Sequence, residues 1–239
     1  GAGFDTVTFT PGVTPLNLDL SGLWTSGQYA SGGLSIVGVE GLGAITGGAS
    51  ADVVVVGAAY TNKATLSGGG GDDRLTGGGG ADTISGDAGD DLLSGGDGRD
   101  LLIGGEGADT LNGDAGDDTF VIDGNDRLID GGAGVDTLSF EWGRDYASQA
   151  LNIDLTGLWA GGAGLINGAE IRSIEKIDLF YGSRLADRVI FGVGPSDFST
   201  KLNVSLGEGD DYAVGGAGGD SLDGGLGNDT LYGGAGGDH

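Results

Sequence analysis

The chain lacks several residue types on which other classes of protein depend. Its 239 residues contain no cysteine, so neither disulfides nor thiolate metal sites hold it together. The only histidine is His239, and no Ser/His/Asp set, cysteine nucleophile or HExxH helix can be assembled, so we expect no catalysis. No apolar run reaches 18 residues, and we therefore expect no segment to span a membrane.

Positive charge and proline are scarce as well. The 10 Lys and Arg residues stand against 36 Asp and Glu, a formal net charge of -26, which excludes nucleic acid or an anionic membrane as a partner bound by charge attraction. The favoured partner is cationic. There are 57 Gly but only 3 Pro, which excludes collagen and proline-rich linkers. Glycine at this level without a period would indicate disorder, so the period decides the class.

The glycines do have a period, of nine residues. Nonapeptides run in one phase from 68 to 139, and the same phase returns from 206 to the end. Position six carries Asp73, Asp82, Asp91, Asp100, Asp109, Asp118, Asp136, Asp211, Asp220, Asp229 and Asp238. Position eight is apolar in Leu75, Ile84, Leu93, Leu102, Leu111, Phe120, Ile129 and Leu138. Acids on a merely solvated surface have no reason to keep this phase with an apolar partner two places on.

A longer duplication is superimposed on the nonapeptides. The segment LNLDLSGLW at 16–24 is echoed by LNIDLTGLW at 151–159, so that Trp24 matches Trp159. The sequence therefore divides into a β-rich block (1–67), a nonapeptide array (68–139), a second β-rich block (140–205) and a second, truncated array (206–239). We expect no helix. The tryptophans are interpreted as caps of a core, with a paired ligand or assembly contact as the alternative.

Nine residues suit a six-residue glycine loop followed by a three-residue strand with only its middle side chain pointing inward. One such unit buries too little to fold alone, so two nonapeptides should form a coil and successive coils should stack. Loops eighteen residues apart then lie above each other. Two carboxylates stacked about 5 Å apart repel by on the order of 3 kcal/mol, so the stack needs a cation. Oxygen-only loops favour calcium over zinc or magnesium.

The pattern GGxGxDxUx resembles the nonapeptide of the repeats-in-toxin (RTX) family of secreted calcium-binding proteins. The resemblance implies an all-β fold, a parallel β-roll or β-solenoid with irregular β-rich flanking blocks. It further implies export by a type I secretion system and folding outside the cell in millimolar calcium, at the envelope of a Gram-negative bacterium.

By the same resemblance, the aspartates at position six supply carboxylates and the loop glycines supply carbonyls to about 5–8 calcium ions. The carbonyl donors would be Gly68, Gly70, Gly77, Gly79, Gly86, Gly95, Gly104, Gly113, Gly131, Gly215 and Gly224. The carboxylate pairs would be Asp73 with Asp91, Asp91 with Asp109, Asp82 with Asp100, Asp100 with Asp118, Asp118 with Asp136, Asp211 with Asp229, and Asp220 with Asp238. Asp52 and Asp187 keep position six but lose the fourth glycine, and their role stays open.

One repeat has a cation where the carboxylate is due. Arg127 takes position six, while Phe120, Ile129 and Leu138 keep the apolar phase, so we expect the coil to continue. Arg127 is predicted to contact Asp109, eighteen residues back, in place of a calcium ion. The alternative is that Asp126 acts as a displaced ligand.

The sequence thus predicts a calcium-binding structural and folding module of a secreted or cell-surface bacterial protein, unfolded without calcium. A shaft or lattice of an adhesin or surface-layer protein is favoured, with a surface glycan, self-assembly or another surface protein as partner. The alternative is the export tail of a secreted enzyme or toxin. The chain begins and breaks off within repeats, and we expect it to be a piece of a longer protein.

Overall fold

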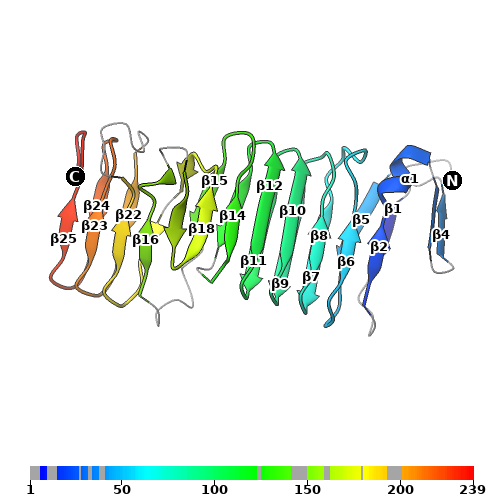
Figure 1. Ribbon diagram of the computed structural model, residues 1–239, viewed down its shortest axis with the longest axis horizontal. Coiled ribbons are helices and arrows are strands. Elements are labelled where there is room, and N and C mark those ends of the chain that lie inside the picture. The colour runs from blue at the N-terminus through cyan, green and yellow to red at the C-terminus, as the bar shows by residue number, and fades with distance from the viewer. Residues whose placement is uncertain are drawn as a thin grey trace. The chain divides into compact units, whose positions relative to one another are not determined.

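The computed structural model describes residues 6–9, 15–26, 28–31, 34–37, 41–122, 125–140, 150–158, 162–178, 180–192 and 201–239. The chain forms two compact units, one of residues 1–120 with 132–134 and one of residues 121–131 with 135–239. Almost all of the regular structure is strand (Figure 1). The prediction of an all-β solenoid of stacked parallel coils is confirmed. The four-part division of the sequence stays a prediction.

The first unit is built from two parallel sheets and a hairpin. The first sheet has the order β1 (Thr6–Phe9), β5 (Gly41–Thr46), β7 (Thr65–Gly70), β9 (Thr83–Ala88), β11 (Leu101–Glu106) and β13 (Thr119–Ile122), the last containing the boundary between the units. The second has the order β2 (Asn17–Asp19), β6 (Val53–Val55), β8 (Arg74–Thr76), β10 (Leu92–Asp97) and β12 (Thr110–Ala115). Strands β3 (Gln28–Ser31) and β4 (Leu34–Val37) pair antiparallel.

The register of these sheets shows that one coil contains two nonapeptides. Leu93 pairs with Leu111 across β10 and β12, and Ile84 pairs with Leu102 across β9 and β11, each a step of eighteen residues. The side chains at position eight from 75 to 138 are all at most 1% exposed. They form the core between the two sheets because each coil buries its apolar residue against the next one.

Strand length differs from the prediction. Strands β9 to β12 each have six residues, because they include the first three residues of the following nonapeptide. In β10 the side chain of Leu93 and then Gly95 face inward. Glycine at that place keeps the interior narrow enough for the backbone to continue pairing with its neighbours. The three-residue strand predicted from the sequence is found in β8.

The second unit contains parallel ladders with an antiparallel insertion. One sheet has the order β14 (Leu128–Asp130), β18 (Ala169–Arg172), β17 (Gly164–Ile166), β16 (Asn152–Asp154), β21 (Arg188–Ile190), β23 (Tyr212–Val214) and β25 (Thr230–Tyr232). The other ladders pair β15 (Thr137–Phe140) with β19 (Lys176–Ile177), and β20 (Phe180–Tyr181) with β22 (Asn203–Ser205) and β24 (Ser221–Asp223). The antiparallel pairs join β17 to β16 and β18. Buried Phe180 packs edge-on against Phe140 and Phe191, with ring centroids 5.0 and 5.9 Å apart.

A short helix, α1 (Ser21–Ser26), was not predicted. Asp19 Oδ1 accepts hydrogen bonds from the backbone N–H and the hydroxyl of Ser21, at 3.0 and 2.6 Å, and so satisfies donors at the helix start. Asp154 Oδ1 does the same for Thr156 in the second copy, which supports the duplication. The side chain of Trp24 and the whole of Trp159 lie outside what the structure describes. In the described part of the chain, no helix is long and apolar enough to cross a membrane.

Candidate metal centre

The aspartates at position six lie inside the coils rather than on the surface. Relative exposure is 3% or less for Asp73, Asp82, Asp91, Asp100, Asp109, Asp118, Asp136, Asp211 and Asp220. Asp229 and Asp238, in the last two repeats, are half-buried. Burying a carboxylate is unfavourable unless hydrogen bonds or a cation compensate for its lost hydration. The surroundings of each oxygen therefore decide what the array can bind.

One oxygen of each carboxylate joins consecutive coils. Asp91 Oδ1 accepts the backbone N–H of Asp73 at 2.7 Å, and Asp109 Oδ1 accepts that of Asp91 at 2.8 Å. On the other side of the coil, Asp100 Oδ1 accepts the N–H of Asp82 at 2.7 Å. The same bond links Asp100 to Asp118, Asp211 to Asp229 and Asp220 to Asp238. The structure thus brings together six of the seven predicted pairs. The seventh, Asp118 with Asp136, spans the two compact units and stays a prediction.

The second oxygen has no hydrogen-bond partner in Asp73, Asp91, Asp100 and Asp211, although it is buried. Burial raises the pKa of Asp73 to about 6, and the neighbouring charge of Asp91 raises it further, against the opposing hydrogen bond from Asp52. Burial likewise raises the pKa of Asp100 to about 7. It also raises the pKa of Asp91 and Asp211. An ionised carboxylate is therefore unfavourable at these four positions without a cation.

In the loops of Asp73, Asp91 and Asp100, the orphaned oxygen and a carbonyl oxygen from the next coil both lie beside the first glycine. A Cβ added to Gly86 would collide with Asp91 Oδ2 and would lie 2.6 Å from the carbonyl oxygen of Gly104. A Cβ on Gly95 would likewise meet Asp100 Oδ2 and lie 2.8 Å from the carbonyl oxygen of Gly113. A carboxylate of the same repeat and a carbonyl oxygen also lie beside Gly68, Gly77, Gly131 and Gly215, whereas beside Gly224 the nearest atoms all belong to the Asp229 side chain. Glycine is thus required at the first position of these repeats because two oxygens occupy the place of a side chain.

These donors fit a calcium ion. Carboxylate and carbonyl oxygens on a flexible loop are the ligands that calcium prefers, and the ion would supply the positive charge that the buried oxygens lack. Among the described residues, no group of three or more His, Cys, Asp or Glu side chains gathers as a metal site. Carbonyls must then provide most of the ligands. The remaining predicted donors, Gly70 and Gly79, lie in these loops and donate backbone N–H to the carbonyls of Gly48 and Tyr60.

Two predicted ligands have different surroundings. Asp82 Oδ2 accepts the N–H of Gly78 at 2.6 Å, and Asp220 Oδ2 accepts that of Gly216 at 2.8 Å, so both oxygens of each carboxylate are hydrogen-bonded. Asp52 and Asp187, which lost the fourth glycine, show the same arrangement.

At the anomalous repeat the coil continues as predicted, with Ile129 fully buried in β14. Asp126 is 4% exposed, whereas Arg127 is exposed. The burial thus favours the alternative that Asp126, one place early, takes the place of the carboxylate. Arg127 and Asp109 belong to different compact units. The predicted contact between them stays a prediction.

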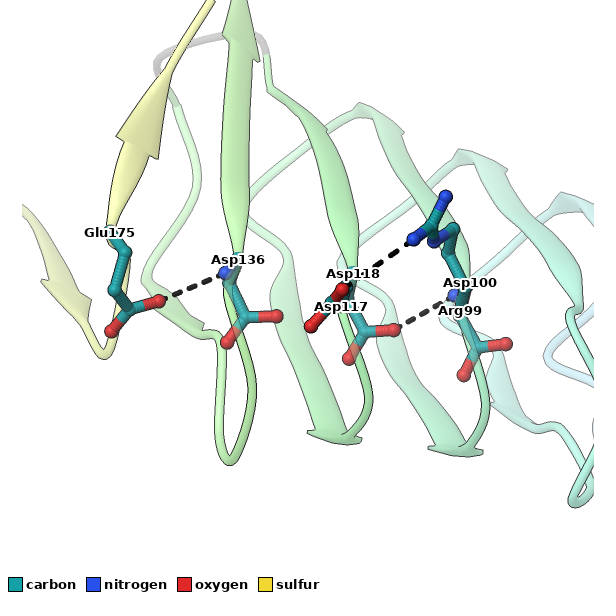
Figure 2. A network of polar contacts seen from close by, with 6 residues as sticks. All are labelled: Arg99, Asp100, Asp117, Asp118, Asp136 and Glu175. Atoms are coloured by element: carbon teal, nitrogen blue, oxygen red, sulfur yellow. Dashed lines mark hydrogen bonds and ion pairs between the residues drawn. The ribbon is translucent and has the colours of Figure 1, made fainter. Parts of the chain in front are cut away.

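Sequence reasoning missed a carboxylate that takes the same place in an irregular coil. Glu175 Oε2 accepts the backbone N–H of Asp136 at 2.9 Å (Figure 2). The Glu175 N–H in turn donates to the Asp136 carbonyl at 3.1 Å. Asp118 makes the corresponding contact with Asp100 in the first unit (Figure 2). The spacing from Asp136 to Glu175 is 39 residues, which a search at nine or eighteen cannot find.

Four stretches of the chain match the family model of the RTX calcium-binding nonapeptide repeat: residues 64–93, 85–120, 123–147 and 206–239. The chain is an RTX-type repeat protein. Every predicted aspartate ligand lies inside these matches, whereas Asp52 and Asp187 lie outside them. A search of curated proteins found no match. RTX repeats in a β-solenoid make this a calcium-binding repeat module, and they typically belong to secreted proteins.

Proposed function

We propose that this RTX protein is a calcium-dependent structural and folding module of a secreted or cell-surface bacterial protein, exported by a type I system. The observation that carries the proposal is the set of buried, unpartnered Oδ2 atoms on Asp73, Asp91, Asp100 and Asp211. Without a cation these oxygens oppose folding, and with calcium they hold consecutive coils together. Ion binding and folding are then one event, with site affinities of roughly 10⁻⁴ to 10⁻³ M, as in other extracellular modules.

The duplication supports a role as the shaft or lattice of an adhesin or surface-layer protein. Each copy of the duplicated segment is followed by a nonapeptide array, and each contains the same turn, in which Asp19 binds Ser21 and Asp154 binds Thr156. A stalk gains length from repeated modules, whereas an export tail needs one array. We further propose that the module has no catalysis of its own, because its buried carboxylates already link consecutive coils and bind the ions. Surface glycan, another surface protein and self-assembly are the proposed partners.

Calcium titration of the full chain tests the folding role. Far-UV circular dichroism should show little strand signal in excess chelator and a cooperative rise in millimolar calcium. Asp100→Asn should shift the midpoint to higher calcium because it replaces a buried, unpartnered oxygen, whereas Asp97→Asn, on an exposed side chain of β10, should not. Strand signal that persists unchanged in chelator would overturn the proposal.

The shaft role has a separate test. Pulling the chain from both ends by force spectroscopy should give high unfolding forces in calcium and none in chelator. Equal forces in the two conditions would reject a calcium-stiffened shaft. Low forces in calcium from a chain that still folds with the ion would favour the export tail instead.

A further inference from the structure

In four of the stacked aspartates, both carboxylate oxygens accept hydrogen bonds from backbone N–H groups. Their Oδ2 atoms accept from the second residue of their own loop, with Gly48 bonding Asp52 at 2.6 Å, Gly78 bonding Asp82 at 2.6 Å, Ser183 bonding Asp187 at 2.7 Å and Gly216 bonding Asp220 at 2.8 Å. Their Oδ1 atoms accept from the preceding coil. These charge-assisted hydrogen bonds compensate for burial without a metal ion.

Each of the four is the first aspartate of its column. The Oδ1 donors on the preceding coil are Leu16 for Asp52, Ala64 for Asp82, Leu151 for Asp187 and Leu202 for Asp220. For Asp73, Asp91 and Asp100 the donor is itself an aspartate. The first carboxylate of a column therefore has no carboxylate below it with which to share a cation.

The loops of aspartates with both oxygens hydrogen-bonded also differ in backbone conformation from the loops of aspartates whose Oδ2 has no partner. In loop 86–91 the second and fourth residues, Asp87 and Gly89, have φ of 71° and 138°. In loops 47–52 and 182–187, all of which the structure describes, no residue has a left-handed φ. At the fourth position these two loops carry Ser50 and Leu185, side chains that disfavour the left-handed region. Their sequence therefore favours the conformation in which the loop N–H binds the aspartate.

We propose that Asp52 and Asp187 are calcium-free caps, at which backbone amides replace the ion and form the first rung of each array without metal. The backbone N–H of each cap donates to Oδ1 of an aspartate whose Oδ2 has no hydrogen-bond partner. Asp52 donates to Asp73 at 2.7 Å, and Asp187 donates to Asp211 at 2.8 Å. The caps thus give the first calcium-binding loop a preformed surface on which to stack.

The RTX matches support this division, since they begin at residues 64 and 206, after the two caps. Asp82 and Asp220 make the same hydrogen bonds, but their loops keep glycine at the fourth position, Gly80 and Gly218. Nothing in those two sequences prevents the loop from taking the other conformation. The proposal is therefore confined to Asp52 and Asp187, and it rests on the proposed calcium-dependent function.

Counting bound calcium in the full chain by equilibrium dialysis tests the caps. Asp73→Asn and Asp211→Asn should lower the number of ions bound at saturation. Asp52→Asn and Asp187→Asn should bind as many ions as the unsubstituted chain. Their folding midpoint in calcium should rise by about twofold at most, because the loss of one backbone hydrogen bond is spread over the several ions that bind on folding. A loss of ions in Asp52→Asn equal to that in Asp73→Asn would overturn the proposal.

A second measurement needs no substitution and covers the case in which the cap variants do not fold. Crystals of the calcium-loaded chain should show anomalous scattering peaks beside Oδ2 of Asp73, Asp91 and Asp100, but none beside Oδ2 of Asp52 or Asp187. A peak at either cap rejects the inference alone. An unsubstituted chain that binds no calcium rejects the proposed function, so the two failures are distinguishable.

Discussion

Acid should partly replace calcium in folding this chain. Burial raises the pKa of Asp73 to about 6 and of Asp100 to about 7, from an ordinary value of 3.8. Because the folded state then binds protons more tightly than the unfolded state, the free energy of unfolding of the calcium-free chain rises as the pH falls through 7 and 6. The gain is lost again as the pH returns to 8. Calcium-bound protein should behave in the opposite way, since protons compete with the ion for the same oxygens.

The size of the effect follows from the two pKa values. Between pH 8 and pH 5, protonation of folded Asp100 contributes about 2.6 kcal/mol and that of folded Asp73 about 1.4 kcal/mol, after subtracting the small uptake of the unfolded chain. Together they give about 4 kcal/mol, or roughly a thousandfold in the folding equilibrium constant. Asp91 and Asp211, whose pKa burial also raises, act in the same direction.

The assay is far-UV circular dichroism of calcium-free chain at pH 8 and pH 5, with urea titration wherever a folded baseline exists. Acid also relieves the general repulsion of a chain with a net charge of -26, so a control is needed. The double variant Asp73→Asn with Asp100→Asn should lose the specific gain, while Asp97→Asn should keep it. Strand signal no greater at pH 5 than at pH 8 refutes the reasoning, and an equal gain in the double variant refutes the assignment to these two carboxyls.

Two further predictions concern the interior of the coils. Gly86→Ala should lower the stability of the calcium-bound chain by about 1–3 kcal/mol, because the methyl group would collide with Asp91 Oδ2. Gly22→Ala, where an added Cβ meets nothing within 4 Å, is the control in thermal unfolding. An equal loss of stability in the two variants would contradict the close approach of Asp91 Oδ2 to Gly86. Leu93→Ala should cost about 2–5 kcal/mol in urea unfolding, whereas Leu92→Ala, on the 36% exposed neighbour, should cost far less. A similar cost for both would mean that the coil is not packed as described.

The regular coils could be predicted from the sequence because period, burial and charge agree there. The nine-residue phase correctly indicated that Leu93 and Leu111 stack at eighteen residues and that Asp73 lies beneath Asp91. Strand length was wrong because a glycine carries no hydrophobic signal, although its backbone pairs as well as that of any other residue. The sequence did not reveal Glu175 as a substitute for an aspartate because chain length between coils is set by loops, and loops outside the array follow no period.

The sequence also could not predict which of the two backbone conformations each loop takes. Loops 77–82 and 86–91 both have glycine at the first and fourth positions, yet only the second shows left-handed φ. Glycine permits both conformations at similar cost, so the sequence of the two loops does not decide between them. The loops differ in the residue that they meet on the preceding coil, which is Ala64 in one case and Asp73 in the other. Only the three-dimensional neighbours contain that information.

The bond from Oδ1 to the N–H one coil below has a consequence for how such arrays change length. Because both sides of the coil use the same nonapeptide, deletion of residues 86–94 would move Asp100 onto Asp73 and would place an apolar residue against Ile84 as before. The loops of Asp109 and Asp118 would change sides and lie over Asp82 and Asp100, so each would still meet a carboxylate. Gene duplication or slippage can therefore add or remove single repeats without a new fold. At the caps the steps are irregular, 36 residues from Leu16 to Asp52 and 24 from Asp187 to Asp211, so that insertions of other lengths can accumulate there.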